Sequence, residues 1–332
     1  MSETGLFLPY VNQKPSLFSD NDGTTFKDSV FSTLQFDVPA RLRKEHNLQA
    51  LINKDYKSDK DTIIFDEDGD ILVNRASDQK RNETARLFIE HKNSTDLTNV
   101  GRQLWRGALY LADYLLELCD KNVINEDQYI SNGAWLEIGA GTGLLAVISY
   151  MVKPKQISTS NLLYITDISD ILPLTQSNIG KNLKDTQNLI KIMPLDLKDE
   201  ELPNELFDKE ISLVLAADII YEDELTDGII QTLYTLILQQ HQLKSLHKSK
   251  RNLLSCLFSI EKRINFTIRN MNICAPAYDY FSEKLRELDH KLNQSNIKLN
   301  FEYITLDDST QWLCYERCKD VVIIKIDVTI LH

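Results

Sequence analysis

Three glycines and a carboxylate stand at regular spacing near the middle of the chain. The run Trp-Leu-Glu-Ile-Gly-Ala-Gly-Thr-Gly-Leu places Glu137 two residues before Gly139, and glycine recurs at every second position. A strand that turns sharply beneath a ligand and enters a helix needs glycine, because a Cβ would hold the ligand away from the backbone. The run therefore predicts a strand-to-helix turn that binds a nucleoside-type ligand at Gly139, Ala140 and Gly141.

The spacing of these glycines discriminates between ligand classes. The dinucleotide fingerprint Gly-x-Gly-x-x-Gly would need glycine where this chain has Leu144. A phosphate-binding P-loop is excluded because no Gly-Lys-Ser/Thr follows the turn. Gly-x-Gly-x-Gly with Glu137 upstream favours the methyl donor S-adenosylmethionine. A glycine-rich turn that binds nothing is the alternative.

A second carboxylate follows the next expected strand. The apolar run at 162–166 ends at Asp167, 28 residues after Gly139. At the carboxyl end of a neighbouring parallel strand, Asp167 would accept hydrogen bonds from ribose hydroxyls. Alternatively, Asp167 caps the helix expected over 171–183.

A third polar group follows the apolar strand expected at 211–217. Asp218 and Tyr221 leave the sheet at the same carboxyl edge, where ligands of open α/β sheets bind. A carboxylate and an aromatic ring over a sulfonium methyl could hold an amine by hydrogen bonding and cation–π contact. The alternative is that Asp218 caps the following helix while Tyr221 packs.

Strands and helices alternate around these residues. Apolar positions recur at helical spacing from Leu104 to Cys119, which predicts a helix before the first central strand. Strands are expected at 134–138, 162–166, 190–194, 211–216 and 253–258, and helices from 144 and over 171–183, 224–240 and 278–292. This order predicts a doubly wound, Rossmann-like α/β sheet with right-handed crossovers. Strands at 299–304 and 321–330 lack a crossover helix between them, so we expect an antiparallel edge pair.

The N-terminal part differs in composition. Residues 1–60 show no sustained periodicity and are expected to form an irregular or mobile arm. Residues 61–99 are expected to form a β-hairpin extension, because apolar runs at 62–65 and 71–73 flank an acidic turn with Gly69. A calcium loop is excluded at this turn, since its glycine comes two residues early and Ser77 occupies the twelfth position.

Composition and charge limit the partners. No run approaches the roughly 20 apolar residues of a membrane helix, and the first ten residues lack the features of a secretion signal. We therefore expect no membrane association and a cytoplasmic or nuclear location. The net charge of −12 disfavours nucleic acid and favours a basic protein partner. Cys314 and Cys318 have no companion ligands nearby in sequence, so no metal is expected.

Five segments form a set: Gly-Arg-Gln-Leu-Trp-Arg-Gly-Ala at 101–108, Leu-Glu-Ile-Gly-Ala-Gly-Thr-Gly at 136–143, Thr-Asp at 166–167, Leu-Asp at 195–196 and Ala-Ala-Asp-Ile-Ile-Tyr at 216–221. Together they resemble the seven-β-strand protein-lysine methyltransferases, often called methyltransferase family 16. The runs over 100–109 and 216–227 are the most specific. The resemblance covers roughly residues 60–332 and implies a methyltransferase domain over 100–332.

The resemblance also implies residue roles. It places Trp105 at the methionine side of the cofactor, where core packing is the alternative role. It places Ala217 against the cofactor and Asp196 near the adenine amino group. Asp218 and Tyr221 are implied to lie at the acceptor lysine.

One position departs from the family pattern. Relatives often have tryptophan after the aspartate at 196, where this chain has Leu197. Loss of stacking on adenine is expected to weaken cofactor binding by about 1 kcal/mol, although leucine still covers the ring with apolar surface.

The expected reaction is transfer of a methyl group from S-adenosylmethionine to a lysine amine of a protein, leaving S-adenosylhomocysteine and requiring no metal. Presenting a neutral lysine at neutral pH costs about 4 to 5 kcal/mol. Desolvation beside a sulfonium lowers the pKa of the amine, and Asp218 is expected to orient the amine rather than deprotonate it. The alternatives are another protein side chain or a small amine as acceptor, or a noncatalytic S-adenosylmethionine-binding interaction module. We expect a monomer.

Overall fold

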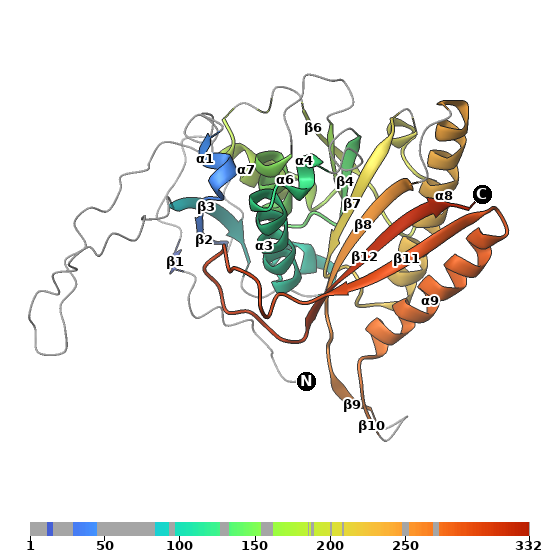
Figure 1. The fold of residues 1–332 in the computed structure, drawn as a ribbon. Helices are drawn as coiled ribbons and strands as arrows, with labels where there is room; N and C mark the ends of the chain where they lie inside the picture. The colour runs from blue at the N-terminus through green and yellow to red at the C-terminus, as the bar shows by residue number, and fades with distance from the viewer. Residues whose placement is uncertain are drawn as a thin grey trace, which may run out of the picture.

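A seven-stranded mixed sheet forms the centre of the computed structural model (Figure 1). The structure describes residues 12–15, 29–44, 84–92, 97–126, 133–153, 162–184, 186, 189–199, 201–207, 209–247, 252–267 and 272–331. The strand order is β11-β12-β8-β7-β4-β5-β6. The strands are β4 (Ala134–Ile138), β5 (Leu163–Asp167), β6 (Ile190–Pro194), β7 (Ile211–Ala217), β8 (Asn252–Glu261), β11 (Ile297–Ile304) and β12 (Val321–Ile330).

Strand directions agree with the alternating order of the elements. β6, β5, β4, β7 and β8 pair in parallel, whereas β12 runs antiparallel to both β8 and β11. The predicted doubly wound sheet and its antiparallel edge pair are therefore confirmed.

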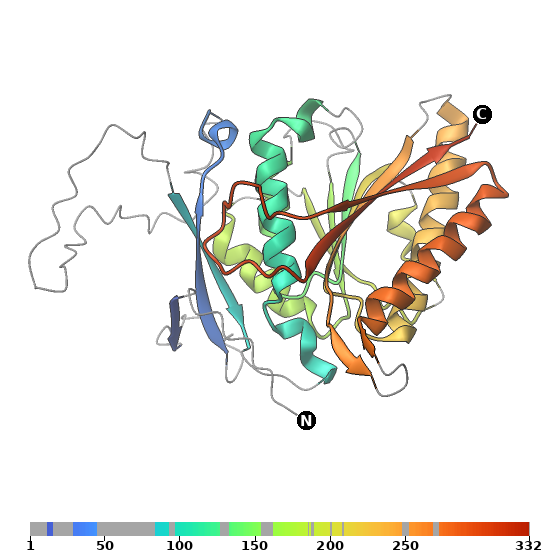
Figure 2. The ribbon, with the colours of Figure 1, turned by 60° about the horizontal axis from the view of Figure 1, so that its bottom comes forward.

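Helices cover both faces of the sheet (Figures 1 and 2). On one face lie α3 (Arg106–Asp120), α6 (Leu144–Val152) and α7 (Leu172–Asn182), and on the other α8 (Asp223–His247) and α9 (Pro276–Asn293). Along β7, Leu213 and Leu215 pack in the core on the α3 side, whereas Val214 and Ala216 pack on the α8 side. Burial of both faces explains why this strand is apolar at every position from Leu213 to Ala217.

The N-terminal part forms a small antiparallel sheet of β1 (Asn12–Pro15), β2 (Val30–Asp37) and β3 (Thr84–His91), followed after β2 by α1 (Ala40–Lys44). The side chains of Leu34, Phe36 and Val38 are at most 1% exposed. The expectation of an irregular arm is therefore wrong for residues 29–44. The alternation of apolar and polar residues in this segment is short, and its partner strand β3 lies far along the chain. The local sequence pattern therefore does not predict the strand. The hairpin expected within 62–73 lies outside the described residues.

Two asparagines join the small sheet to α7. Asn178 accepts from the N–H of Glu90 at 2.9 Å and donates to its carbonyl at 2.8 Å. Asn182 makes the same pair of bonds with Phe88, each at 2.8 Å. Four helical residues rise about 6 Å and two strand residues about 6.6 Å, so the spacings match. The two asparagine amides thus form hydrogen bonds with the backbone N–H and carbonyl groups at the free edge of β3, as a neighbouring strand would.

The connection between β11 and β12 holds the other side of the small sheet (Figure 2). It crosses α3, where the buried Asp113 accepts from the N–H of Trp312 at 2.7 Å and pairs with Arg317. The carbonyl of Trp312 in turn accepts from the N–H of Asp37 in β2 at 2.9 Å. The small sheet is therefore fixed to both α7 and α3.

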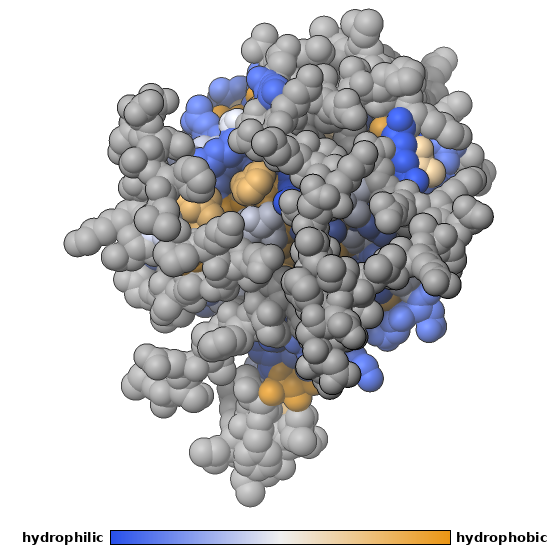
Figure 3. All heavy atoms as spheres, turned by 90° about the vertical axis from the view of Figure 1, so that its left-hand side faces the viewer, coloured by the Kyte–Doolittle hydropathy of each residue, from blue (hydrophilic) through white to orange (hydrophobic). Residues whose placement is uncertain are grey.

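The side of the molecule that carries the small sheet has a mixed surface. In Figure 3, hydrophobic residues show as small separate areas between hydrophilic ones. Phe88, on β3, is 38% exposed. No helix among the described residues is both long and apolar enough to span a bilayer.

Candidate active site

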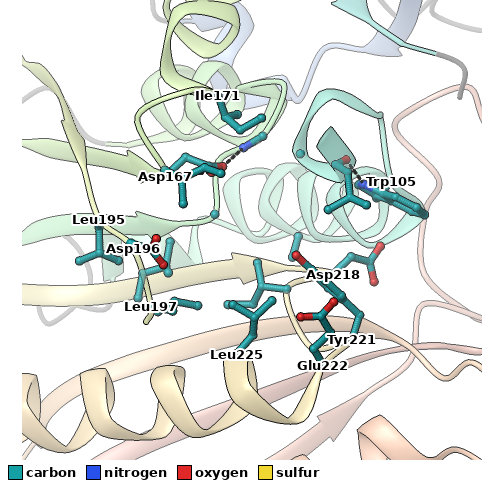
Figure 4. Close-up of a pocket in the computed structure, with 18 of the residues that line it drawn as sticks. Trp105, Asp167, Ile171, Leu195, Asp196, Leu197, Asp218, Tyr221, Glu222 and Leu225 are labelled. Atoms are coloured by element: carbon teal, nitrogen blue, oxygen red, sulfur yellow. Dashed lines mark hydrogen bonds between the residues drawn. The ribbon is translucent and has the colours of Figure 1, made fainter. Parts of the chain in front are cut away.

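A pocket of about 550 Å³ opens at the carboxyl ends of β4, β5, β6 and β7 (Figure 4). The chain proceeds outward from β4 through β5 to β6 and then returns to β7 on the other side of β4. Such a reversal leaves a crevice at the sheet edge, and ligands of open α/β sheets bind there. Eight of the ten residues selected from the sequence line it: Trp105, Gly139, Gly141, Asp167, Asp196, Ala217, Asp218 and Tyr221.

The structure does not place Glu137 or Ala140 on the pocket wall. Ala140 is buried, and its N–H donates to the carbonyl of Thr166 at 2.9 Å. Glu137 is buried just before the turn, and its Oε2 has no hydrogen-bond partner in the described part of the chain. Burial, with the charge of Asp167, raises the pKa of Glu137 well above its usual value. An orphaned buried oxygen at this place is a group that a bound polar ligand could satisfy.

The turn after β4 is built from left-handed backbone. Gly139, Gly141 and Gly143 have φ angles of +70°, +52° and +78°. A Cβ on Gly139 would lie 2.5 Å from Cγ2 of Ile219. Glycine is therefore required here both by conformation and by space.

Helix α7 supports this turn from behind. The hydroxyl of Thr175 donates to the carbonyl of Gly141 at 2.6 Å. Asn178, which pairs with β3, also donates to the carbonyl of Thr142 at 2.9 Å. The side chain of Asn178 therefore links the small N-terminal sheet directly to the glycine-rich turn.

Asp167 lies at the end of β5, facing the turn (Figure 4). Its Oδ2 accepts from the N–H of Gly141 and its Oδ1 from the N–H of Ile168, each at 2.7 Å. Burial raises the pKa of Asp167 to about 6, although these two hydrogen bonds oppose the shift. The carboxylate is held rigidly and retains acceptor capacity for a ligand hydroxyl.

Asp196 and Leu197 lie near Asp167 at one end of the pocket (Figure 4). The Oδ1 of Asp196 accepts from the N–H of Lys198 at 3.0 Å, which fixes the loop after β6. Helix α8 touches this loop at Gly228, where an added Cβ would overlap the carbonyl oxygen of Leu197. Close helix packing thus holds an apolar side chain in the pocket wall.

Trp105, Asp218 and Tyr221 lie together at the other end (Figure 4). Trp105 is the residue that immediately precedes α3, rather than part of that helix. Its indole Nε1–H donates to the carbonyl of Val100 at 2.9 Å, which fixes the ring beside the pocket. Trp105 therefore lines the ligand space and does not belong wholly to the core.

Asp218 has a second, structural role. Its Oδ2 accepts from the N–H of Gly107 at 2.6 Å and its Oδ1 from the N–H of Glu261 at 2.9 Å. Asp218 itself has a φ of +53°, a conformation unusual outside glycine. Burial raises its pKa to about 6 against these two hydrogen bonds. The carboxylate thus caps α3, not the following helix α8, and joins it to the end of β8.

Several residues at or beside the pocket were not selected from the sequence, Ile168, Asp170, Ile171 and Lys198 among them. Ile219, Glu222 and Leu225 line the pocket and follow Asp218 so closely that the run over 216–227 could have indicated them. Arg263 lies after β8, with its guanidinium carbon 5.3 Å from the ring of Trp105. No local pattern marks Arg263, since the partners of its side chain come from distant parts of the chain.

No metal centre is found in the described ranges: they contain no group of three or more His, Cys, Asp or Glu side chains that could hold an ion.

Residues 81–262, more than half of the chain, match the family 16 model described as lysine methyltransferase. The chain belongs to this lysine methyltransferase family. The family membership inferred from the sequence motifs is thereby confirmed.

The chain is similar to methyltransferase-like protein 22 of Mus musculus, with 32% identity over 285 residues. The match covers 80% of this chain and 65% of the relative. The Homo sapiens protein of the same name is 33% identical over 282 residues, covering 80% and 62%. Protein-lysine N-methyltransferase EFM6 of Saccharomyces cerevisiae is 27% identical over 145 residues, covering 41% and 58%. The chain spans less than two thirds of the length of these relatives.

Both specific runs of this lysine methyltransferase family member meet at the pocket. The run over 100–109 contributes Val100, Gly101 and Trp105, and the run over 216–227 contributes Asp218 and Tyr221 among others. The two runs are joined directly by the hydrogen bond from the N–H of Gly107 to Oδ2 of Asp218.

Proposed function

We propose that this protein transfers a methyl group from S-adenosylmethionine to a lysine side-chain amine of a protein substrate. The observation that carries the proposal is a single pocket with two chemically distinct ends. One end joins the glycine turn to Asp167, and the other joins Trp105, Asp218 and Tyr221. Membership of the lysine methyltransferase family supports lysine as the acceptor.

The residues of the pocket fit S-adenosylmethionine. The bare backbone of the turn allows close approach, Asp167 can accept from ribose hydroxyls, and Leu197 offers apolar cover for adenine. The orphaned oxygen of Glu137 is a further polar group near the turn. A volume of about 550 Å³ lies within the ordinary range for cofactor sites. When bound, the cofactor would supply a methyl group on a positively charged sulfur.

The chain's own residues would hold and orient the amine. The rings of Trp105 and Tyr221 line the end of the pocket that would receive the lysine, here called the acceptor end. Asp218 lies at the same end, between α3 and β8, and each of its carboxylate oxygens already accepts a hydrogen bond from a backbone N–H. With a pKa of about 6, Asp218 is too weak a base to hold a lysine proton at neutral pH. Its part in catalysis is therefore to position the amine and the walls around it, and the proton leaves to water.

The surroundings of the acceptor end favour a basic partner. Glu222 lines the pocket, and Asp223, Glu224 and Asp227 follow it at the start of α8, all four being exposed. Together with a net charge of −12, this acidic rim would attract a lysine that lies among other basic residues.

The direct test uses purified protein, radiolabelled S-adenosylmethionine and lysate from cells that lack this protein. We expect a discrete labelled protein band that yields methyl-lysine on hydrolysis. Binding of the cofactor without any labelled protein would contradict the proposal. Label in a small amine would indicate a different acceptor, and no label at all would indicate a binding module.

Replacing Asn178 should affect the cofactor as well as stability. Asn178→Ala and Asn182→Ala each remove one pair of bonds to β3, so each should lower the free energy of unfolding by about 1 to 3 kcal/mol. Only Asn178 also holds the carbonyl of Thr142 in the turn. We therefore expect Asn178→Ala alone to weaken S-adenosylmethionine binding, by about three- to tenfold in calorimetric titration. Equal affinity of the two variants would contradict this coupling.

Cofactor binding should weaken in acid. The pKa of Asp167 is raised to about 6, so its carboxylate is ionised at pH 7 and becomes protonated as the pH falls to 5. The protonated group is a poorer acceptor for ribose hydroxyls, and it no longer offers a negative charge to the sulfonium. The dissociation constant should rise about three- to tenfold between pH 7 and pH 5. Asp167→Asn should bind more weakly at pH 7 and lose most of this dependence; an unchanged dependence would exclude Asp167 as its source.

A further inference from the structure

Glu222 lies in the wall of the acceptor end, one residue after Tyr221 (Figure 4). It is exposed to solvent and immediately precedes α8. Its backbone carbonyl accepts from the N–H of Thr226 at 3.0 Å, which fixes the residue to the first turn of that helix. The carboxylate of Glu222 is therefore carried by a fixed element and borders both the pocket and the solvent.

The carboxylate of Glu222 forms no hydrogen bond and no ion pair with the residues that the structure describes. Neighbouring acidic side chains are engaged instead. Glu224 pairs with Lys198 at 2.6 Å, and Glu261 pairs with Arg106 at 2.8 Å. Glu222 thus keeps the full acceptor capacity of a carboxylate for a ligand in the pocket.

The charges around Tyr221 favour a cation at this end of the pocket. Burial raises the pKa of Tyr221, and the negative charge of Glu222 is the next largest cause. The charge of Asp167 acts in the same direction. The positive charges of Arg263 and Lys198 oppose this shift with smaller effects, so they do not cancel the charge of Glu222.

The acceptor of the proposed reaction arrives as a cation, since a lysine amine has a pKa of about 10.4. Taking an ammonium out of water is costly unless a counter-charge or an aromatic ring accompanies it. Trp105 and Tyr221 provide the rings. Asp218 offers a limited counter-charge, because each of its oxygens already accepts a backbone N–H. The unpaired carboxylate of Glu222 is the group that remains for the ammonium.

We propose that Glu222 binds the ammonium of the acceptor lysine at the mouth of the pocket, before the amine loses its proton. This inference rests on the proposed lysine methyltransferase function. Because Glu222 is exposed, the bound ammonium stays in contact with water, which can take the proton. Glu222 thus determines the affinity for a cationic acceptor and does not act in the transfer step.

The proton and the electrons of the reaction are accounted for. The ammonium at Glu222 releases its proton to water, and the neutral amine moves inward. Its lone pair forms the new C–N bond while the C–S bond breaks, and the electron pair of the broken bond stays on the sulfur of S-adenosylhomocysteine. The methylated amine carries the positive charge.

A structural role of Glu222 predicts a different result. A negative charge at the start of a helix stabilises that helix through its dipole, and Glu222 stands just before α8. Such a role would change thermal stability and leave the binding of a cation unchanged. The test therefore compares two ligands that differ only in one cationic group.

Both ligands are stable analogues of S-adenosylmethionine with nitrogen in place of sulfur. In the first, an aminobutyl chain replaces the methyl group and extends toward the acceptor end. In the second, a pentyl chain of the same length has a methyl group where the first has the amine. Calorimetric titration at pH 7 gives the affinity of the aminobutyl probe relative to the pentyl probe, defined here as the amine preference.

Four forms of the full chain are compared: wild type, Glu222→Gln, Glu222→Lys and Asp223→Asn. The amine preference should fall about three- to fivefold in Glu222→Gln, as for the loss of one exposed ion pair, and about tenfold in Glu222→Lys, which adds a like charge. Asp223 is exposed but does not line the pocket. Removing its charge should lower the preference by less than about twofold. The difference between wild type and Glu222→Gln should also shrink in about 0.5 M salt.

The outcomes separate this inference from the proposed function. S-adenosylmethionine is titrated first, and failure of wild type to bind it would overturn both. If it binds, an unchanged amine preference in Glu222→Gln, or a preference in Glu222→Lys no lower than in Glu222→Gln, would overturn the role of Glu222 alone. Loss of S-adenosylmethionine affinity in Glu222→Gln beyond about twofold would do the same, because Glu222 would then act at the cofactor. A decrease in Asp223→Asn equal to that in Glu222→Gln would show that the acidic rim as a whole, and not Glu222, attracts the amine.

Discussion

Gly139→Arg is expected to abolish S-adenosylmethionine binding, lowering affinity by at least about 100-fold. Gly139 has a φ of +70°, where a residue with a Cβ loses about 1 to 2 kcal/mol. The Cβ would lie 2.5 Å from Cγ2 of Ile219, and the rest of the side chain would enter the pocket that Gly139 lines. Calorimetric titration with the cofactor measures the loss, and circular dichroism shows whether the fold is retained.

The matched control for this change is Gly180→Arg. Gly180 lies in α7, and no atom lies within 4 Å of the position its Cβ would take. Arginine favours helix over glycine by about 0.5 to 1 kcal/mol, so this variant should be as stable as wild type or more stable. Its cofactor affinity should be unchanged. Near-normal binding by folded Gly139→Arg would show that the turn is not the cofactor site.

Asp218→Ala is expected to lose methyl transfer by at least about 100-fold while cofactor affinity stays within a few fold. The change leaves the buried N–H of Gly107 and the part-buried N–H of Glu261 without their acceptor, which should lower the free energy of unfolding by about 1 to 3 kcal/mol. It also frees the first turn of α3 next to Trp105, and misplacement of about 1 Å at a reacting centre can cost about 100-fold in rate. Transfer to the labelled protein band and cofactor titration measure the two effects separately.

A milder variant distinguishes an acceptor-side role from general loss of folding. Tyr221→Phe removes one hydroxyl and keeps the ring that lines the pocket, so the fold and cofactor affinity should be unchanged. Transfer should fall about tenfold if the hydroxyl helps to orient the amine. Should Asp218→Ala lose cofactor affinity in proportion to activity, its acceptor-side role would be disproved.

The sequence alone determined the elements whose signal is local. The glycines at 139, 141 and 143 indicate a backbone in the left-handed conformation, because few other residues adopt that conformation without strain. The unbroken apolar run from Leu213 to Ala217 in β7 indicates a strand covered on both faces, as found. Residue type and short-range periodicity thus sufficed for the central sheet and its helices. They also singled out Gly139, Gly141, Asp167, Asp218 and Tyr221, which line the pocket, whereas Trp105, Asp196 and Ala217 were selected only through the resemblance to the family.

Tertiary structure decided what depends on neighbours far apart in the chain. Asp218 caps a helix that begins more than 100 residues earlier, and β2 finds its partner in β3. Glu137, at the end of a strand, proved to be buried before the turn, not exposed on the pocket wall. Arg263 meets Trp105 only because β8 ends beside the start of α3. Such contacts carry no local pattern, since they arise where packing brings strand ends and helix starts to one edge of the sheet.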